Sequence, residues 1–543
     1  MTAREAGTSA APSGRQWSGP QPGDLTALGL QTALVVLIYW PTYKLQFTSD
    51  AWVFLERFRD GLWPAVLTPI GYHWQPVAYA WVVLLRSLFD ERPAVFQAVN
   101  LAQLILLGHL TYWLGRRLLQ DAGVAFLASL LVLGSSSFYE ATYWSLSGNM
   151  HLLGADFYVL AIILACDVAR GRLGRGGPWL LGLTVLGSVF AHPAMITAVP
   201  VCALTLFLMG RERSNAESSN TSWRWVKGLL PLLAVAVIFG ITRMAFVGYS
   251  GEAPKPGIDA QRLYLLVQRG LFELFSLQAS PTFVDRVMIP GAVPALGTPF
   301  TSLMVGIWLG VAAVFAALLL WRVRISGIRL LIGFLAIHLA ALTVASGLTP
   351  RQCTILAIPA AMLTVWAFRL VADRFGRMAP GSTASAVCRE LPGALVLLLV
   401  LFAQPDHQTA ARLSIRAGNA VRALVHQIRA VAPPGGKQVD LMLVNMPSEM
   451  IDRGMSVWVF ANGLEELAHA ASPAVGTVEV RQMPGWGPPD EVSPTIRSLN
   501  AETLRLQLAD PYRVILVFER EPFGVRTVTA KDLERFPPGP IPR

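Results

Sequence analysis

The sequence is poor in charged residues. Of its 543 residues, 14% are Asp, Glu, Lys or Arg, whereas 53% are hydrophobic, and the mean hydropathy is +0.49. Soluble domains carry about 25% charged residues, so this deficit excludes an ordinary soluble protein. Apolar windows of the roughly 20 residues that a bilayer span needs recur along most of the first 404 positions. The composition therefore predicts an all-α polytopic membrane protein.

Cysteine is also scarce. The four cysteines lie in or beside apolar segments, at spacings that form neither a disulfide framework nor a metal-binding motif. We interpret them as small buried apolar residues. The formal net charge of +10 is compatible with nucleic-acid binding, but the arginines punctuate apolar segments instead of gathering on one face. No nucleic-acid partner is therefore expected.

About eleven transmembrane spans are expected. They cover residues 25–43, 95–115, 120–138, 148–168, 178–192, 194–210, 228–246, 301–321, 328–346, 352–372 and 389–404. With the N-terminus inside, every inward loop is basic and the short outward turns are nearly free of Lys and Arg, which is the positive-inside pattern. We therefore expect a multi-pass protein of the inner (plasma) membrane with a cytoplasmic N-terminus, where residues 1–24 form a disordered tail. The odd number of spans places the C-terminus on the periplasmic side.

Two outward loops, 44–94 and 247–300, are too long to be simple turns. The first contains two stretches, Trp52–Arg59 and Val77–Leu88, with apolar residues at helical spacing and interspersed charge. The second contains an amphipathic stretch at Gln261–Leu277. Such segments are typical of helices that lie on or dip into the membrane interface.

The composition changes after Phe402. Residues 405–543 are charged and rich in Pro, with three short apolar runs that predict strands: Val439–Val444, Val475–Val480 and Val514–Phe518. Gly463–Ala471 between them predicts a helix. We therefore expect a transmembrane domain at 25–404 and a small periplasmic α/β domain at 405–543.

Three polar residues stand in the expected outward loops. Asp50 follows the first span and precedes an amphipathic segment, so it either caps the helix that begins at Ala51 or faces a cleft. His73 precedes the second span, and Glu140 lies in the short loop Tyr139–Trp144. Both are either interfacial polar groups or part of a site.

Other polar residues lie within or beside the spans, where burial in lipid is costly. Asn149 and Asp156 are seven positions apart and share one helix face. Arg243 lies near the outer end of its span, and Arg351 lies in an outer turn; the planar guanidinium suits a phosphate. The alternative for each is helix-to-helix hydrogen bonding or snorkelling. His192 and Pro193 mark a tight outward turn, for which a catalytic role is disfavoured.

Together these features resemble the GT-C class of membrane glycosyltransferases, in particular protein O-mannosyltransferases and their bacterial multi-span relatives. The resemblance covers roughly residues 25–372, and it rests on Thr48–Trp52 after the first span, His73–Pro76 before the second and Tyr139–Trp144 after the third. Arg351 resembles the outward arginine that such enzymes use near the lipid phosphate.

The resemblance implies a polyprenyl-phosphate-linked sugar as donor and an acceptor hydroxyl on a protein or glycan at the outer face of the membrane. Asp50 matches the catalytic base of that class. His73, Glu140 and Arg351 lie in the segments that carry the resemblance, and Asn149, Asp156 and Arg243 are the polar residues of the spans; we predict that these six bind substrate. Many relatives carry a second acid after the first, whereas here Ala51 follows Asp50, so the need for a divalent metal is left open. The turn at His192 also departs from the basic-acidic pair of relatives.

The implied chemistry suits this layout. A lipid-phosphate leaving group needs charge neutralisation more than protonation, which arginines provide, and one carboxylate suffices as general base. Direct displacement inverts the anomeric configuration. Two alternatives remain: a transporter or flippase of lipid-linked or polar solutes, which would show paired interrupted helices in its two halves, and a catalytically inactive membrane scaffold.

Overall fold

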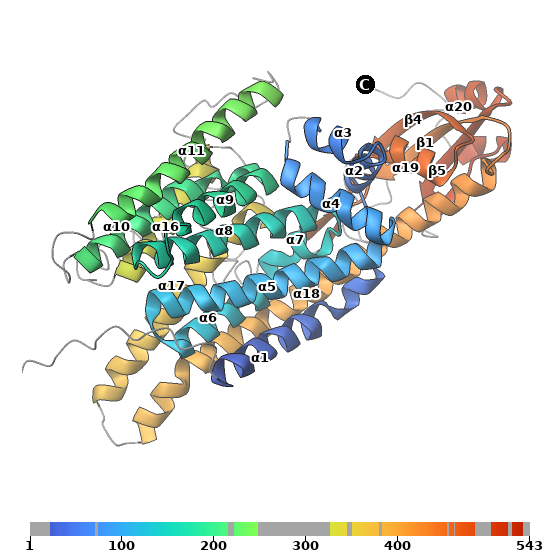
Figure 1. Ribbon diagram of the computed structural model, residues 1–543. Coiled ribbons are helices and arrows are strands. Elements are labelled where there is room, and N and C mark those ends of the chain that lie inside the picture. The colour runs from blue at the N-terminus through green and yellow to red at the C-terminus, as the bar shows by residue number, and fades with distance from the viewer. Residues whose placement is uncertain are drawn as a thin grey trace, which may run out of the picture.

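Long apolar helices make up most of the molecule in the computed structural model (Figure 1). The structure describes residues 22–70, 74–214, 222–247, 326–344, 350–378, 383–452, 455–460, 462–483, 501–519 and 524–535. Within these ranges, seven helices are long and apolar enough to cross a membrane, and four shorter apolar helices accompany them. The expected class, a polytopic helical membrane protein with a C-terminal α/β unit, is confirmed.

Each expected span that falls within the described residues corresponds to a helix. The bundle consists of α1 (Pro22–Tyr39), α5 (Pro93–Leu119), α6 (Ala122–Gly134), α8 (Ser147–Ala169), α9 (Gly177–Ala191), α10 (Ala198–Ser214), α11 (Ser222–Phe246), α16 (Ser326–Val344), α17 (Pro350–Met378) and α18 (Thr383–Val431). The expected span 301–321 and the amphipathic stretch Gln261–Leu277 lie outside the described residues.

Helices α5 and α8 run parallel and fix the axis of the bundle. At one end the Asn149 amide donates to the Phe96 carbonyl at 2.8 Å. At the other end Arg117 pairs with Asp167 at 2.9 Å. Because both contacts join the same two helices about 30 Å apart along the axis, they fix the register of α5 against α8.

Short helices cover one end of the bundle. They are η1 (Trp40–Lys44), α2 (Ala51–Phe58), α3 (Leu62–Leu67), α4 (Pro76–Phe89), η2 (Ser136–Phe138), α7 (Tyr139–Tyr143) and η3 (Pro193–Thr197). The two amphipathic stretches expected in the loop 44–94 are α2 and α4. Tyr79 of α4 packs against Phe54 and Phe58 of α2, with ring centroids 5.9 and 5.4 Å apart. This aromatic cluster holds the two helices together.

Helix α18 is much longer than the span expected at 389–404. It has 49 residues and continues to Val431, a length of about 72 Å. Beyond Gln404 its buried residues recur at helical spacing, for example Leu413, Ala417 and Leu424. The rise in charge after residue 404 therefore marks the exposed face of the same helix, and the chain leaves the bundle without a break.

The C-terminal unit is built on a four-stranded sheet of order β4-β1-β5-β6. Its elements are β1 (Val439–Pro447), β2 (Glu449–Asp452), β3 (Met455–Trp458), α19 (Leu464–Ala471), β4 (Val475–Met483), α20 (Ala501–Leu508), β5 (Arg513–Glu519), β6 (Gly524–Thr527) and η5 (Ala530–Arg535). The central strand β1 pairs in parallel with β4 and β5, and β6 is an antiparallel edge. The three predicted strands and the predicted helix are all present.

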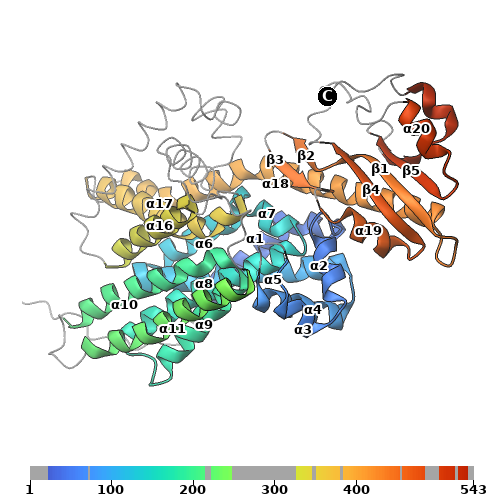
Figure 2. The ribbon, with the colours of Figure 1, turned by 90° about the horizontal axis from the view of Figure 1, so that it is seen from above.

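The C-terminal unit lies at the same end of the bundle as the short helices. Both views show α18 leading to the sheet, with α2 beside α19 (Figures 1 and 2). The hairpin β2–β3 packs along α18. The loop after the first span therefore meets the C-terminal unit, although some 400 residues separate them in the sequence.

Candidate functional site

Asp50 lies where the loop after η1 enters α2. It occupies the N-cap position of α2, but its side chain makes no capping hydrogen bond. Instead, its Oδ1 accepts from the Asn462 amide at 2.6 Å and from the Ser49 hydroxyl at 3.3 Å. Its Oδ2 accepts no hydrogen bond within the described ranges. The interpretation of Asp50 as a helix cap is therefore wrong, and one carboxylate oxygen is left for a ligand.

The backbone around Asp50 is docked on the C-terminal unit. The Ser49 amide donates to the Val459 carbonyl at 2.8 Å, and Ser49 adopts a positive φ of 51°. Gly463 approaches so closely that a Cβ there would lie 2.8 Å from the Ser49 carbonyl oxygen and 3.2 Å from the Trp52 Cβ. The C-terminal unit thus holds the Asp50 loop through its backbone as well as through Asn462.

Sequence reasoning missed Asn462. It stands 412 positions from Asp50 and belongs to no motif with a chemical role. The dipeptide Asn462-Gly463 indicates only a turn. The structure reveals its contact because it brings that turn to the loop after α1.

Glu140 lines a small cleft next to the Asp50 loop. Predicted in a loop, it lies on the short helix α7. The cleft has a volume of about 20 Å³, enough for one water-sized group. Its lining residues are Thr48, Tyr139, Glu140, Tyr143, Trp144, Ser414, Val457 and Trp458. Thr48 and Glu140 come from the bundle side and Trp458 from β3, so the cleft lies between the two parts of the molecule.

Two polar groups in this cleft differ in their hydrogen bonding. The Ser414 side chain is 4% exposed, and its hydroxyl has no hydrogen-bond partner in the part of the chain that the structure describes. The Tyr143 hydroxyl donates to the His407 carbonyl at 3.3 Å. Burial raises the pKa of Tyr143, which keeps the phenol protonated. The cleft therefore presents one carboxylate and one unsatisfied hydroxyl on an aromatic wall.

Asn149 and Asp156 lie in the bundle rather than in this cleft. The Asn149 amide donates to the Phe96 and Ser145 carbonyls, both at 2.8 Å, which favours a packing role. Asp156 lies about 10 Å deeper on the same face of α8. Its carboxylate is 5% exposed and makes no hydrogen bond to the described residues. A substrate contact for either residue stays a prediction.

Arg243 lies at the end of α11, close to Tyr79. Burial raises the pKa of Tyr79, and the nearby charge of Arg243 acts in the opposite direction. One guanidinium nitrogen of Arg243 is buried without a hydrogen-bond partner among the described residues. Next to it, Trp74 stacks on Phe246 with ring centroids 4.3 Å apart. Because Tyr79 also belongs to the aromatic cluster of α2 and α4, Arg243 lies beside that cluster.

The other predicted site residues are less fully described. Arg351 lies in the first turn of α17, which packs against α7 and η2, but its side chain is outside the described residues. His73 is also outside them. His192 caps η3 by accepting from the Ala194 amide at 3.3 Å, as suits a residue at a tight turn.

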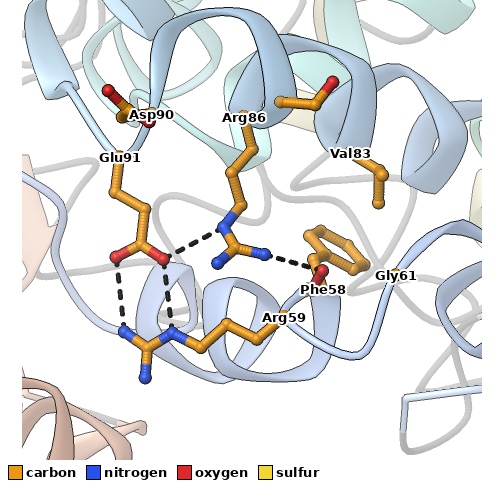
Figure 3. A pocket seen from close by; sticks show the side chains of 8 residues that line it. Phe58, Arg59, Gly61, Val83, Arg86, Asp90 and Glu91 are labelled. Carbon is orange, nitrogen blue, oxygen red and sulfur yellow. Dashed lines mark hydrogen bonds and ion pairs between the residues drawn. The ribbon is translucent and has the colours of Figure 1, made fainter.

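A separate polar pocket lies between α2 and α4 (Figure 3). Glu91 accepts from Arg59 and Arg86 at 3.1 to 3.3 Å, and Arg86 also donates to the Phe58 carbonyl at 2.8 Å. Partial burial works against the charged form of Arg59, but the hydrogen bond and charge of Glu91 prevail and raise its pKa. Since Glu91 holds both arginines, we assign this cluster to the joining of α2 and α4.

Within the described ranges, no three His, Cys, Asp or Glu side chains gather into a metal-binding group. Asp50 meets an amide and a hydroxyl rather than a second acid.

No protein-family model matches the chain, and no curated protein matches it. It is similar to the solved structure of an oligosaccharyltransferase from Archaeoglobus fulgidus, at 14% identity and a TM-score of 0.48, over 91% of this chain and 69% of that one. It is also similar to ArnT from Cupriavidus metallidurans bound to undecaprenyl phosphate, at 13% identity and a TM-score of 0.44, over 83% of this chain and 89% of that one. It is similar, too, to arabinosyltransferase EmbB from Mycobacterium smegmatis, at 14% identity and a TM-score of 0.31, over 78% of this chain and 44% of that one.

These neighbours are GT-C-fold glycosyltransferases, the class that the sequence resembles. At these identities and TM-scores the similarity assigns no residue of this chain a role. The functional proposal therefore depends on the groups around Asp50.

Proposed function

We propose that the protein is an inverting glycosyltransferase that moves a sugar from a polyprenyl-phosphate donor to an acceptor hydroxyl on the outer face of the membrane. The observation that carries the proposal is the state of Asp50. Its carboxylate makes no helix cap, is held through Oδ1 by Asn462, and keeps Oδ2 free of hydrogen bonds among the described residues. A general base needs such an oriented, available oxygen.

In the proposed reaction, Asp50 Oδ2 accepts the proton of the acceptor hydroxyl. The acceptor oxygen then forms a bond to the anomeric carbon, while the bond from that carbon to the phosphate oxygen breaks. The polyprenyl phosphate leaves with the bonding electron pair. Because attack and departure occur on opposite faces of the carbon, the anomeric configuration inverts.

The leaving phosphate requires positive charge rather than a proton. We propose that Arg243 supplies it, because one of its guanidinium nitrogens is buried without a hydrogen-bond partner in the described part of the chain. Arg351 is the second candidate, since α17 begins beside α7, which carries Glu140. Guanidinium groups suit this task because they bind phosphate oxygens in a bidentate manner.

The acceptor is proposed to approach along the cleft at Glu140. Glu140 and the unsatisfied Ser414 hydroxyl offer an acceptor and a donor of hydrogen bonds there. The cleft has a volume of about 20 Å³, which admits a single hydroxyl-sized group. We therefore expect Trp458, which lines the cleft and is 40% exposed, to move when an acceptor binds.

The test is sugar transfer by the Asp50→Asn variant in proteoliposomes with a polyprenyl-phosphate sugar. Loss of a positioned general base lowers the rate by about 10²- to 10⁴-fold. The Asp60→Asn variant is the matched control, because Asp60 is an exposed acid of the same loop and should retain full activity. Wild-type rates in Asp50→Asn would remove this residue from the mechanism, and movement of the lipid without a covalent product would favour a flippase.

A further inference from the structure

A cavity of about 710 Å³ lies at the opposite end of the bundle, at the turn between α8 and α9. We call it the α8–α9 pocket; its polar lining is Arg172, Arg175 and Lys227. Lys227 comes from α11, which packs against α9. Helix α8 has 23 residues, so this pocket lies about 33 Å along the axis from the end that carries α7 and Asp50.

The charge of the α8–α9 pocket is positive. Arg172 approaches Asp167 at 3.4 Å, but Asp167 is held more closely by Arg117 at 2.9 Å. Arg175 and Lys227 have no acidic partner in the described part of the chain. Three cations thus face the cavity against one shared carboxylate, and an anionic ligand would neutralise the excess.

The backbone of the turn between α8 and α9 also favours an anionic ligand in the α8–α9 pocket. Gly171 has a φ of +66°, and a Cβ at Gly174 would meet nothing within 4 Å, so the turn leaves space above the start of α9. Helix α9 begins at Gly177 with Pro178 in its first turn. The amides of such a helix start favour a negatively charged group.

The surface below the pocket is apolar. On α9, Trp179 is 66% exposed and is followed by exposed Leu180 and Leu183; on α11, Leu230 is 65% exposed and Leu233 is also exposed. The two helices touch closely, because a Cβ on Gly182 would lie 2.6 Å from the Pro231 Cβ. Cations, then an interfacial tryptophan, then leucines follow one another along the same two helices. This order matches the headgroup, interface and acyl chains of a lipid.

We propose that the α8–α9 pocket binds the phosphate headgroup of an anionic membrane lipid, whose acyl chains lie along α9 and α11. Arg175 and Lys227 are the principal contacts, because neither has another charged partner among the described residues. Basic pockets between membrane helices bind anionic headgroups in this manner. The inference does not depend on the proposed glycosyltransferase activity.

The test measures lipid binding to the full-length protein in detergent, by native mass spectrometry with phosphatidylglycerol and with phosphatidylcholine. Phosphatidylglycerol should bind at least tenfold more tightly. Each of Arg175→Ala and Lys227→Ala should weaken it about fivefold, and the double variant about thirtyfold. Arg175→Lys, which keeps the charge, should stay close to the wild type.

The matched control is Arg374→Ala, which removes an exposed cation from the end of α17, away from the pocket. It should leave phosphatidylglycerol binding within twofold of the wild type. Equal weakening in this control would show a general charge effect and overturn the proposal. So would wild-type binding by the double variant, or displacement of the lipid by an equal concentration of inorganic phosphate.

Discussion

Single residues from distant parts of the sequence meet at the proposed catalytic carboxylate. Asp50 belongs to the loop that follows α1 and Asn462 to the C-terminal unit, and the Asn462 amide donates to the Asp50 carboxylate at 2.6 Å. A donated hydrogen bond fixes the carboxylate but leaves its second oxygen for the acceptor. We therefore propose that Asn462 is a positioning residue for Asp50, distinct from groups that touch the substrate.

Removal of this amide should lower turnover more than it affects substrate affinity. For Asn462→Ala we expect a kcat about tenfold below the wild type, since a hydrogen bond to a charged group is worth about 1.5 kcal/mol or more. KM should change less than twofold. Asn462→Asp, which replaces the donor by a second acid, should be at least as impaired.

The matched control for this experiment is Asn419→Ala. Asn419 is another exposed asparagine, paired with Arg422 on α18, and its loss should leave kcat unchanged. A rise in KM with constant kcat in Asn462→Ala would assign Asn462 to substrate binding instead and refute its positioning role.

Local sequence motifs are sufficient to predict some residues of the candidate site but not others. Asp50 and Glu140 are recognisable because each lies in a short segment that follows a span, and the structure brings their loops together. Asn462 is not recognisable, because its importance arises only from a contact across 412 positions. The capping role considered for Asp50 is compatible with the local sequence, and only the tertiary contact shows that it is wrong.

At the scale of elements, the crossing of α7 over the start of α8 sets the position of Glu140. A Cβ on Gly148 would lie 2.0 Å from the Ala141 carbonyl oxygen, so the two helices approach as closely as only glycine permits. The Asn100 amide reinforces this end by donating to the Ser145 carbonyl at 3.2 Å. Glu140 is therefore held by backbone packing.

Gly148→Ala should displace α7. We expect a fall in Tm of several degrees, consistent with a cost of about 2 kcal/mol for overpacking a tight contact, and at least a tenfold loss of sugar transfer. Gly240→Ala is the control, because Gly240 also lies in a helix but a Cβ there would meet nothing within 4 Å. Equal effects of the two substitutions on Tm and transfer would refute the role given to this crossing.

Helix positions are predictable here because hydrophobic length is a direct requirement of the bilayer. Helix α18 shows the limit of that reasoning. Its second half keeps a buried stripe that includes Ala417 and Leu424, but its exposed face is charged, so average composition makes it resemble the start of a new domain. Periodicity rather than composition carries the information at this point.

At the scale of the whole molecule, the C-terminal unit completes the proposed site by docking on the loop that follows α1. Gly463, with a φ of +76°, lies against Ser49 and Trp52 at this junction. Gly435 has nearly the same φ, +79°, but a Cβ there would meet nothing within 4 Å. These two glycines therefore have nearly the same positive φ and different surroundings.

Ala at either glycine should cost about 1 kcal/mol of stability for the left-handed backbone. Only Gly463→Ala should also separate the C-terminal unit from the Asp50 loop, seen as at least a tenfold loss of transfer and faster limited proteolysis between the two parts. If Gly435→Ala reduced transfer to the same extent, docking would not be needed for activity.

The proposed function requires that the Asp50 loop lie outside the cytoplasm. A cysteine is introduced at Asp60, which is exposed just after α2, or at Arg374, which is exposed at the far end of α17. Cys353 and Cys388 are first replaced by Ala, and the buried Cys166 and Cys202 are kept. Intact cells are then treated with a membrane-impermeant maleimide. We predict that Asp60→Cys is labelled from outside and that Arg374→Cys is labelled only after permeabilisation. The reverse pattern would place Asp50 in the cytoplasm and contradict the proposed function.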